Sequence, residues 1–355
     1  MPSPKPITIV GGGLAGLTLG IGLRHAGIPV TVLEAGHYPR HRVCGEFISG
    51  RGQKVLERLE LKESIVKSGA HWARTAQFFF GTSASLLRPL PSPAWSVSRF
   101  TLDALLAEKF RRLGGELREG ERQRESTLGE GMVCARGRRA QPSEGGHRWF
   151  GLKAHGRNVP LTADLEMHAL GNGYVGLTRL EDGVVNVCGL FRRKAADAAH
   201  QKPLLSSASN PLIRELGSQP GTPLFHRLAN AAFDEASLCS VAGLPLRPQS
   251  AAGRNECCIG DALTMIPPVT GNGMSMAFES AEIAAGPLEG WSRGTLSWNA
   301  ARQAIARDCD RLFGRRLAWA RLAQWMMFAP ILQGRLGAFL LRSDLFWRQL
   351  FACTR

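Results

Sequence analysis

The feature that most constrains this chain is a glycine turn, G-x-G-x-x-G at residues 11–16, that follows directly on an apolar run at residues 7–10. A helix-compatible segment comes next at residues 17–26, and a second apolar run at residues 30–33 leads into Glu34. Strand, tight turn, helix, strand and acid in this order are the arrangement of a dinucleotide-binding unit. The N-terminal part is therefore expected to begin a Rossmann-like sheet.

Each glycine of this turn has an expected role. Gly11 permits the turn, Gly13 lets the backbone approach a pyrophosphate, and Gly16 lets the helix pack closely on the strand. The helix N-terminus offers unpaired amides to phosphate, and Glu34 is placed to accept hydrogen bonds from a ribose. The nucleotide contacts predicted for this unit are Gly11, Gly13, Leu14, Ala15, Gly16, Glu34 and Ala35.

The composition is that of a soluble globular protein, with 44% hydrophobic and 21% charged residues in a chain of 355. No apolar run reaches the roughly 18 residues needed to span a bilayer, and the N-terminus shows no signal-peptide pattern. The eight cysteines form no C-x-x-C pair and no Cys/His set with zinc spacing. We therefore expect a cytoplasmic protein without a structural metal.

The formal net charge is +15, and the isoelectric point lies near 10.2. The basic residues form no single run and accompany no nucleic-acid motif, so nucleic acid is not an expected partner. Residues 285–355 carry eleven Arg and no Lys against four acidic residues, together with five Trp. Amphipathic helices of this kind either dock on an anionic membrane surface or acidic protein, or pack on the body with Arg stems over apolar surface.

Nucleotide-binding elements are predicted at both ends of the chain, around a different kind of segment. Residues 98–113 read as a helix capped by Ser98, and residues 115–130 as a charged surface hairpin. Residues 149–191 alternate in hydrophobicity, which is typical of an antiparallel sheet. The predicted fold class is α/β with an α+β insert: a discontinuous Rossmann-like domain (1–75, 98–148 and 239–290), an inserted antiparallel-sheet substrate domain (76–97 and 149–238) and a C-terminal helical segment (291–355).

A second glycine-containing loop is expected to complete the site. An apolar run at residues 257–259 leads to Gly260-Asp261, and the turn Gly271-Asn272-Gly273 precedes a helix. An Asp at a strand end can accept hydrogen bonds from polyol hydroxyls, and the helix N-terminus stabilises negative charge nearby. On physical grounds alone this is an anion-binding turn.

With both loops, the chain resembles the flavoprotein superfamily of aromatic hydroxylases, geranylgeranyl reductases and flavin-dependent halogenases, which share the p-hydroxybenzoate hydroxylase-like fold. The resemblance covers nearly everything up to about residue 290. It implies FAD as cofactor, with the ADP part on the first loop and the ribitol near Gly260-Asp261. It also places Arg99 at the cofactor and the isoalloxazine ring against the turn that contains Pro268, Gly271, Asn272, Gly273 and Met274.

One position departs from the pattern of the superfamily. Its middle motif, usually Asp-Gly, corresponds here to Arg136-Gly137, so an arginine replaces the acid. In the hydroxylases this motif is linked to the handling of both FAD and NAD(P)H. Whether NAD(P)H or another electron donor reduces the flavin therefore stays open.

The segment Arg42-Val43-Cys44-Gly45-Glu46 resembles the Arg/Lys-x-Cys-Gly loop of the geranylgeranyl reductase branch. The resemblance places Arg42, Cys44 and Gly45 beside the flavin. Cys44 is a catalytic candidate that tunes or protonates the flavin, or else a small buried thiol. Glu46 is a general acid/base if it is buried with a raised pKa, or else an acceptor for backbone amides.

The expected substrate sheet supplies a third catalytic candidate, Tyr174, one of only two tyrosines in the chain. His155 and His168 are candidates for substrate contact, although ordinary core or exposed histidines are commoner. Strand alternation points only one set of side chains inward, and the sequence does not say which set. The same uncertainty applies to Trp149, Phe150 and Asn186.

Three reactions fit the superfamily. The Trp-x-Trp-x-Ile-Pro motif of halogenases is absent, and only Tyr174 remains of the Tyr-x-Trp-x-Phe-Pro motif of the reductases. We therefore expect a flavin monooxygenase of secondary metabolism that acts on a lipophilic, aromatic or polyketide-like small molecule. A geranylgeranyl reductase-like reductase of carbon–carbon double bonds is the alternative. A flavin-binding protein without turnover, docking through its basic tail, is a third interpretation.

Overall fold

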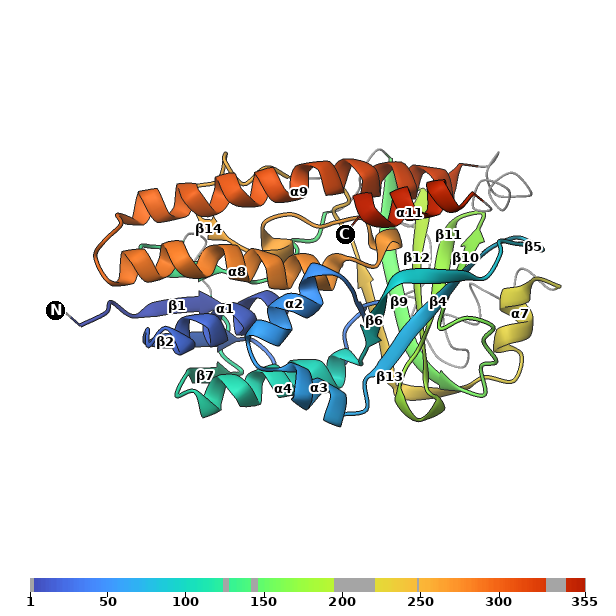
Figure 1. Ribbon diagram of the computed structural model, residues 1–355, viewed down its shortest axis with the longest axis horizontal. Coiled ribbons are helices and arrows are strands. Elements are labelled where there is room, and N and C mark those ends of the chain that lie inside the picture. Colours follow the sequence, from blue (N-terminus) through green and yellow to red (C-terminus); the bar gives the residue numbers. More distant parts are fainter. Residues whose placement is uncertain are drawn as a thin grey trace.

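The computed structural model describes residues 3–123, 128–141, 146–194, 221–247, 249–329 and 343–354. Two sheets follow each other along the long axis of the molecule, a parallel sheet near the N-terminus and a larger sheet at the opposite end (Figure 1). A long helix, α9 (Trp298–Phe328), extends over both of them (Figure 1).

The parallel sheet has five strands in the order β14-β8-β1-β2-β7. They are β1 (Ile7–Val10), β2 (Val30–Glu34), β7 (Glu116–Glu119), β8 (Met132–Cys134) and β14 (Cys257–Cys258). Helix α1 (Leu14–His25) packs against both α4 (Arg99–Arg112) and α8 (Gly273–Ser292). The apolar residues of β1 and α1 are fully buried between these layers, for example Ile9, Leu17 and Leu19. This burial explains why the apolar runs predicted a strand and a helix here.

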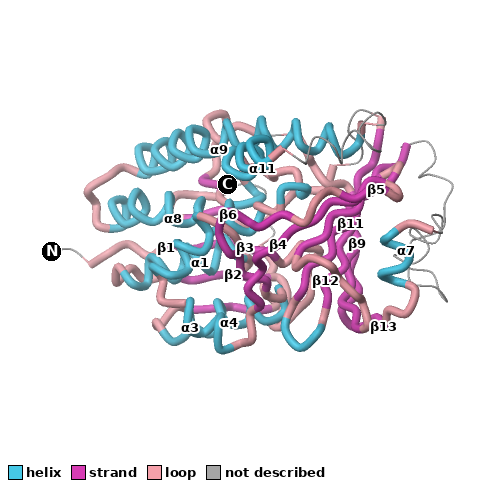
Figure 2. Tube along the Cα trace, turned by 45° about the vertical axis from the view of Figure 1, so that its right-hand side comes forward, coloured by secondary structure: helices cyan, strands magenta, loops and turns pink. Residues whose placement is uncertain are grey.

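The larger sheet has nine strands in the order β13-β9-β12-β11-β10-β4-β6-β3, with β5 paired to β4. Neighbouring strands are antiparallel except β4 and β10, which pair in parallel. The sheet curves strongly in Figure 2. Its strands are β3 (Phe47–Ile48), β4 (His71–Phe80), β5 (Ser83–Ala84), β6 (Arg88–Ser96), β9 (His147–Arg157), β10 (Leu165–Leu170), β11 (Gly173–Arg179), β12 (Val185–Lys194) and β13 (Ala232–Ala242).

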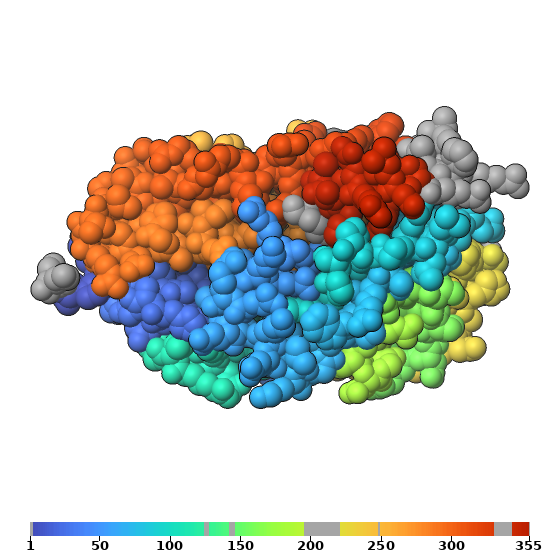
Figure 3. All heavy atoms as spheres, in the orientation of Figure 1, coloured from blue at the N-terminus to red at the C-terminus, as the bar shows by residue number. Residues whose placement is uncertain are grey.

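The C-terminal helices cover the junction between the sheets. A buried ion pair joins α9 to α8, with both guanidinium nitrogens of Arg316 donating to Glu279 at 2.8 and 3.0 Å. Helix α11 (Asp344–Cys353) lies over the strands of the large sheet, where it is seen in red in Figure 3. The remaining helices are short: α2 (Arg51–Arg58), α3 (Lys62–Lys67) and α7 (Pro223–Leu228). Among the described helices, none combines the length and apolarity needed to cross a membrane.

The predicted fold class is confirmed, with parallel strands at both ends of the chain, an antiparallel insert and C-terminal helices. The predicted cap of α4 is also confirmed, because the Ser98 hydroxyl accepts a hydrogen bond from the amide of Thr101. The prediction of a surface hairpin at residues 115–130 is wrong. Glu116–Glu119 is an edge strand of the parallel sheet, whose exposure tolerates its charged side chains. Residues 195–220 and 330–342 of the predicted ranges lie outside the described residues.

Candidate cofactor and substrate cavity

One large cavity, of about 860 Å³, lies where the two sheets meet. Ends of β1 and β2 and the loop after β14 line one half, and β4, β10, β11 and β12 line the other. Residues of α9 and α11 close it on a further side. This volume is in the upper part of the range of about 300–1,000 Å³ that is typical of small-molecule sites.

The glycine turn presents its backbone to this cavity. Gly11 has a φ of +112°, and a Cβ there would come within 2.2 Å of the carbonyl oxygen of Ala135 on the neighbouring loop. A Cβ at Gly16 would come within 1.9 Å of the Gly11 carbonyl oxygen, so close packing of helix on turn requires that glycine. A Cβ at Gly13, by contrast, meets nothing within 4 Å, and Gly13 lines the cavity. The turn therefore leaves an open cradle at Gly13.

The amides at the start of α1 face the same cradle. Helix α1 has no side-chain cap, and its first residues, Leu14 and Ala15, line the cavity. The first N–H groups of a helix have no partner within the helix, and the helix dipole adds partial positive charge there. This half of the cavity thus fits an anionic group such as a pyrophosphate.

Glu34 lies at the end of β2, buried at the wall of the cavity. Its two carboxylate oxygens accept hydrogen bonds from the amides of Gly12 at 2.9 Å and Gly36 at 2.8 Å. Arg40 forms an ion pair with the same carboxylate at 2.8 Å. Glu34 therefore holds the glycine turn and the loop after β2 in place, and neighbouring Ala35 also lines the cavity.

The second predicted loop contributes to the same wall. Asp261 lines the cavity, and burial raises the pKa of its carboxyl group, with Arg138 and Arg99 opposing that rise. Helix α8 begins at the cavity without a side-chain cap, as α1 does. The predicted contacts of this loop that line the cavity are Asp261, Pro268, Gly271, Gly273 and Met274.

Three predicted cofactor contacts lie elsewhere. Gly16 and Gly260 are not among the residues that line the cavity; Gly260 has a φ of +60° and donates its N–H to Ser280. Asn272 is buried, and its side-chain amide donates to the carbonyl oxygen of Thr354 at 2.6 Å. That bond ties the start of α8 to the end of α11, so the Asn272 side chain serves the scaffold rather than the cavity.

Positive charge is concentrated along the cavity wall. Arg99 lines it and is held by a bidentate contact to Asp103, at 2.7 and 2.8 Å. Arg136, the residue that departs from the superfamily pattern, also lines it. Six arginines line the cavity against four acidic residues, so its wall suits an anionic ligand. The arginines at the wall are Arg40, Arg42, Arg99, Arg122, Arg136 and Arg138.

Glu46 is fully buried, and its carboxylate is saturated with partners. One oxygen accepts from the backbone amide of Arg99 at 2.8 Å and lies 3.3 Å from the ammonium of Lys153. The other oxygen lies 2.7 Å from the Nε2 atom of His155. Burial alone would raise the pKa of Glu46, but His155 and Lys153 outweigh it and lower the pKa below its ordinary value. The raised pKa on which the general acid/base interpretation depended is not found, whereas the alternative, an acceptor for backbone amides, is met by the amide of Arg99; Glu46 is a charged anchor.

The buried cluster extends from Glu46 to the surface. Lys153 on β9 is fully buried, and its ammonium lies 3.0 Å from the Nδ1 atom of His41. Burial, followed by repulsion from Lys153, lowers the pKa of His41 to about 4. His41 precedes the Cys-Gly-Glu loop, so this cluster fastens the loop to the large sheet and to the start of α4. Sequence reasoning missed Lys153 because nothing in its local pattern marks a buried charge.

The Cys44-Gly45 segment is held by two strands of the large sheet. Asn186 donates its side-chain amide to the Cys44 carbonyl at 2.9 Å, and the Thr178 hydroxyl donates to the Gly45 carbonyl at 3.0 Å. Arg42, Cys44 and Gly45 all line the cavity, as the resemblance implied. Burial raises the pKa of the Cys44 thiol, which keeps it protonated at neutral pH.

The far half of the cavity is an apolar chamber. Tyr174 on β11 lines it, and among the described residues no partner reaches its buried hydroxyl. Burial raises the pKa of Tyr174, so this hydroxyl remains a hydrogen-bond donor. The other chamber residues are apolar or aromatic: Phe78, Phe80, Leu90, Met167, Leu190, Leu244, Met265, Met327, Phe346, Trp347, Leu350 and Phe351.

Neither histidine proposed for substrate contact lines the cavity. His155 binds Glu46, and His168 lies 3.1 Å from Glu166 and stacks on Phe79. Of the remaining sheet candidates, Trp149 and Phe150 also lie outside the lining residues. The contribution of α11 to the chamber was missed as well. That helix is docked by an ion pair between Arg88 and Asp344 and carries its apolar face inward.

Comparison with known proteins agrees with this geometry. Residues 5–147 match the family of FAD binding domains. The chain is 25% identical over 378 residues to menaquinone reductase of Mycobacterium tuberculosis, covering 95% of this chain and 87% of that protein. It is 28% identical over 125 residues to conditioned medium factor receptor 1 of Dictyostelium discoideum, covering 32% of this chain and 24% of that protein. Compared with longer curated relatives such as conditioned medium factor receptor 1, the chain thus spans only about a quarter of the relative's length.

Solved structures share the whole fold. The flavin-dependent brominase Bmp2 superposes with a TM-score of 0.76 at 18% identity, over 99% of this chain and 93% of that one. The p-nitrophenol 4-monooxygenase PnpA of Pseudomonas putida DLL-E4 superposes with a TM-score of 0.76 at 16% identity, over 99% and 98%. Residues 5–147 therefore resemble an FAD-binding domain, and the chain as a whole has a fold found in flavin-dependent halogenases and monooxygenases.

Proposed function

We propose that the protein is an FAD-dependent monooxygenase that hydroxylates a lipophilic, aromatic or polyketide-like molecule. The observation that carries this proposal is the shape of the cavity. A polar half with a glycine cradle, uncapped helix N-termini and arginines continues into an apolar chamber, where the Tyr174 hydroxyl has no partner among the residues that the structure describes. A cofactor and an apolar substrate would lie next to each other in such a cavity.

The polar half fits FAD by the chemistry of its groups. The amides of Gly13, Leu14 and Ala15 would hold the pyrophosphate, and Asp261 would accept hydrogen bonds from the ribitol. Glu34 would accept from the ribose with the lone pairs that its backbone bonds leave. When bound, FAD would supply the oxidation–reduction chemistry and the activation of oxygen.

The residues of the chain would bind, orient and exclude water. The apolar chamber keeps water away from the reacting atoms, which protects an oxygen-activating site from side reactions. The Tyr174 hydroxyl would donate a hydrogen bond to a carbonyl or phenol oxygen of the substrate, since its raised pKa keeps the proton in place. A substrate with one polar end and a long apolar body satisfies both features.

A double-bond reductase is the second candidate. It is favoured by the alignment with menaquinone reductase, which covers 95% of this chain, and by the same apolar chamber. A reductase needs a proton donor beside the substrate. Cys44 and Tyr174, both protonated at neutral pH, are the cavity groups able to give one.

Halogenation is not favoured by the composition of the cavity. The resemblance implies that halogenases need a lysine in their tunnel, and no lysine is among the described residues that line this cavity. The fully buried Lys153 does not line the cavity, although its partner Glu46 does. NAD(P)H is the reductant we propose, with Arg122 and Arg138 as positive groups at the wall that could contact its phosphates.

We also propose contact with an anionic membrane surface. On α9, Arg311, Arg315, Leu322 and Trp325 are all exposed and recur at helical spacing, so they form one stripe that is basic at one end and apolar at the other. Such a stripe suits the interface of an anionic bilayer. Sedimentation with vesicles of anionic lipid, but not with neutral vesicles, is the expected behaviour. Equal sedimentation with both, or none, would contradict it.

Oxygen labelling tests the proposed reaction. The FAD-loaded protein is reduced without oxygen and mixed with ¹⁸O₂-saturated buffer that contains a long-chain alkylphenol. The masses of the products are then measured by mass spectrometry. A product that carries one ¹⁸O atom supports the monooxygenase. A product that gains two hydrogens from an unsaturated substrate, in the absence of oxygen, supports the reductase. Hydrogen peroxide alone, with every substrate unchanged, would contradict both.

A further inference from the structure

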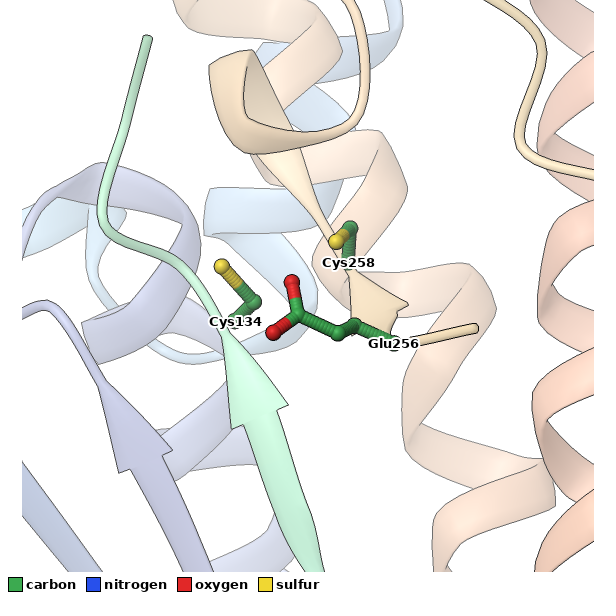
Figure 4. Close-up of side chains that lie close together, drawn as sticks. All are labelled: Cys134, Glu256 and Cys258. Atoms are coloured by element: carbon green, nitrogen blue, oxygen red, sulfur yellow. The ribbon is translucent and has the colours of Figure 1, made fainter. Parts of the chain in front are cut away.

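A compact group of sulfur and oxygen donors lies in the parallel sheet, outside the lining of the cavity. Figure 4 shows Cys134, Cys258 and Glu256 close together on two neighbouring strands. Their donor atoms all lie within 4.8 Å of one another. Cys134 on β8 and Cys258 on β14 are paired in register, which puts their thiols on the same face of the sheet. Glu256 precedes Cys258 by two residues and therefore points to that face too.

The three residues differ in exposure, in a way that suits a closed site with one open side. Both cysteines are almost completely buried, whereas Glu256 is partly exposed. The Glu256 carboxylate accepts a hydrogen bond from the amide of Leu128 at 3.2 Å, which orients it. The Arg254 guanidinium lies 3.8 Å from the Cys258 sulfur. The donors are thus fixed in place before any ligand arrives.

The two thiols lie at paired positions of β8 and β14, so one ion can contact both sulfurs. The thiolate, not the thiol, is the form that binds metals. Binding of a cation here would displace the protons of both sulfurs.

We propose that Cys134, Cys258 and Glu256 bind one zinc ion. Two thiolates and a carboxylate are ligands that zinc accepts in a tetrahedral site, with a water molecule as the fourth ligand. Zinc–sulfur distances of about 2.3 Å and zinc–oxygen distances of about 2.0–2.2 Å allow a single ion to reach donors with this separation. Calcium and magnesium take oxygen ligands and are excluded by the two sulfurs.

Nearby arginines would balance the net charge of the occupied site. Two thiolates and one carboxylate would carry three negative charges, of which zinc neutralises two. Arg254 lies beside Cys258, and Arg139 lies 3.6 Å from Glu256. These arginines would offset the one negative charge that zinc leaves.

The place of the site in the fold suggests what the ion would stabilise. Cys134 directly precedes Ala135, which lines the cavity and contacts the glycine turn. Cys258 lies three residues before Asp261, which lines the cavity on the other side. One ion would therefore clamp the ends of two neighbouring strands that present cavity residues. Its donors are not among the residues that line the cavity, so the ion would act on the fold of this wall and would not contact the substrate.

Zinc analysis of the purified full chain tests this inference. The protein is produced without a histidine tag, dialysed against metal-free buffer and measured by inductively coupled plasma mass spectrometry, alongside Cys134→Ser and Cys258→Ser. Cys257→Ser is the matched control, because Cys257 is equally buried on the same strand but points to the opposite face. We expect about one zinc per chain in the native protein and the control, and background zinc in the two other variants.

X-ray absorption at the zinc edge distinguishes this site from adventitious binding. We expect a shell of two sulfur atoms at about 2.3 Å and oxygen at about 2.0 Å. Zinc without a sulfur shell, or zinc content that is the same in all variants, would overturn the proposal. So would a metal-free native protein in which Cys134 and Cys258 are found joined as a disulfide. None of these readouts depends on flavin or turnover, so they stand apart from the test of the proposed function.

Discussion

Removal of the charge on Glu46 is expected to destabilise the protein strongly, because it leaves the Lys153 ammonium buried without its counter-ion. The carboxylate oxygen and the ammonium nitrogen are 3.3 Å apart, and both side chains are fully buried. At an effective dielectric constant of about 20, two charges at that separation attract each other by about 5 kcal/mol. Breaking one side of a buried pair costs about 3–5 kcal/mol in practice. We therefore expect Glu46→Gln to lower the free energy of unfolding by about 3–5 kcal/mol.

Urea unfolding followed by tryptophan fluorescence measures this loss. The double variant Glu46→Gln/Lys153→Met removes both charges and should recover about 2 kcal/mol or more of the loss, as coupled neighbours do. Glu57→Gln is the control, since the Glu57–Lys62 pair is at 2.8 Å but exposed, and such pairs contribute about 0–1 kcal/mol. If Glu46→Gln costs no more than Glu57→Gln, the assignment of Glu46 as the anchor of a buried charge cluster is wrong.

Three further changes test other parts of the account. Gly13→Val should abolish FAD retention without loss of stability, because a Cβ there meets nothing within 4 Å. Gly22→Ala, in the interior of α1, should keep FAD, and flavin absorbance after gel filtration measures the difference. The folded pKa of His41 is about 4, below the ordinary value of 6.5 for histidine, so the unfolded chain takes up its proton first and stability should fall as pH drops from 6.5 toward 4. Thermal unfolding across that range should show the loss, and His41→Gln should reduce it. Tyr174→Phe should leave stability unchanged, since its hydroxyl has no partner among the described residues, but weaken binding of an alkylphenol by roughly tenfold. Unchanged affinity would contradict the assigned hydrogen bond.

The local parts of the site could be predicted from the sequence. The glycine turn, the cap of α4 and the strand that ends at Glu34 depend on residues close together in the chain, and their spacing alone indicates the structure. The strand at Glu116–Glu119 could not be recognised, because an exposed edge position allows the charged residues that are typical of a hairpin.

The contacts between distant segments could not be predicted. Glu46 was recognised as a loop residue of interest, but its partners Lys153 and His155 lie on a strand more than a hundred residues away. Cys134 and Cys258 show no metal spacing along the chain, and only the parallel pairing of β8 and β14 brings them together. Alternation along the large sheet could not say which face forms the chamber, so the histidines were proposed for substrate contact although they point elsewhere.

The central claim is that one cavity holds FAD and an apolar substrate side by side. The most direct test is an absorbance titration of the FAD-loaded protein with a long-chain alkylphenol. The account predicts a saturable change in the flavin spectrum, since the apolar chamber opens directly onto the half of the cavity assigned to the cofactor. A protein that cannot be loaded with FAD, or a flavin spectrum that does not change while the ligand binds, would contradict the claim.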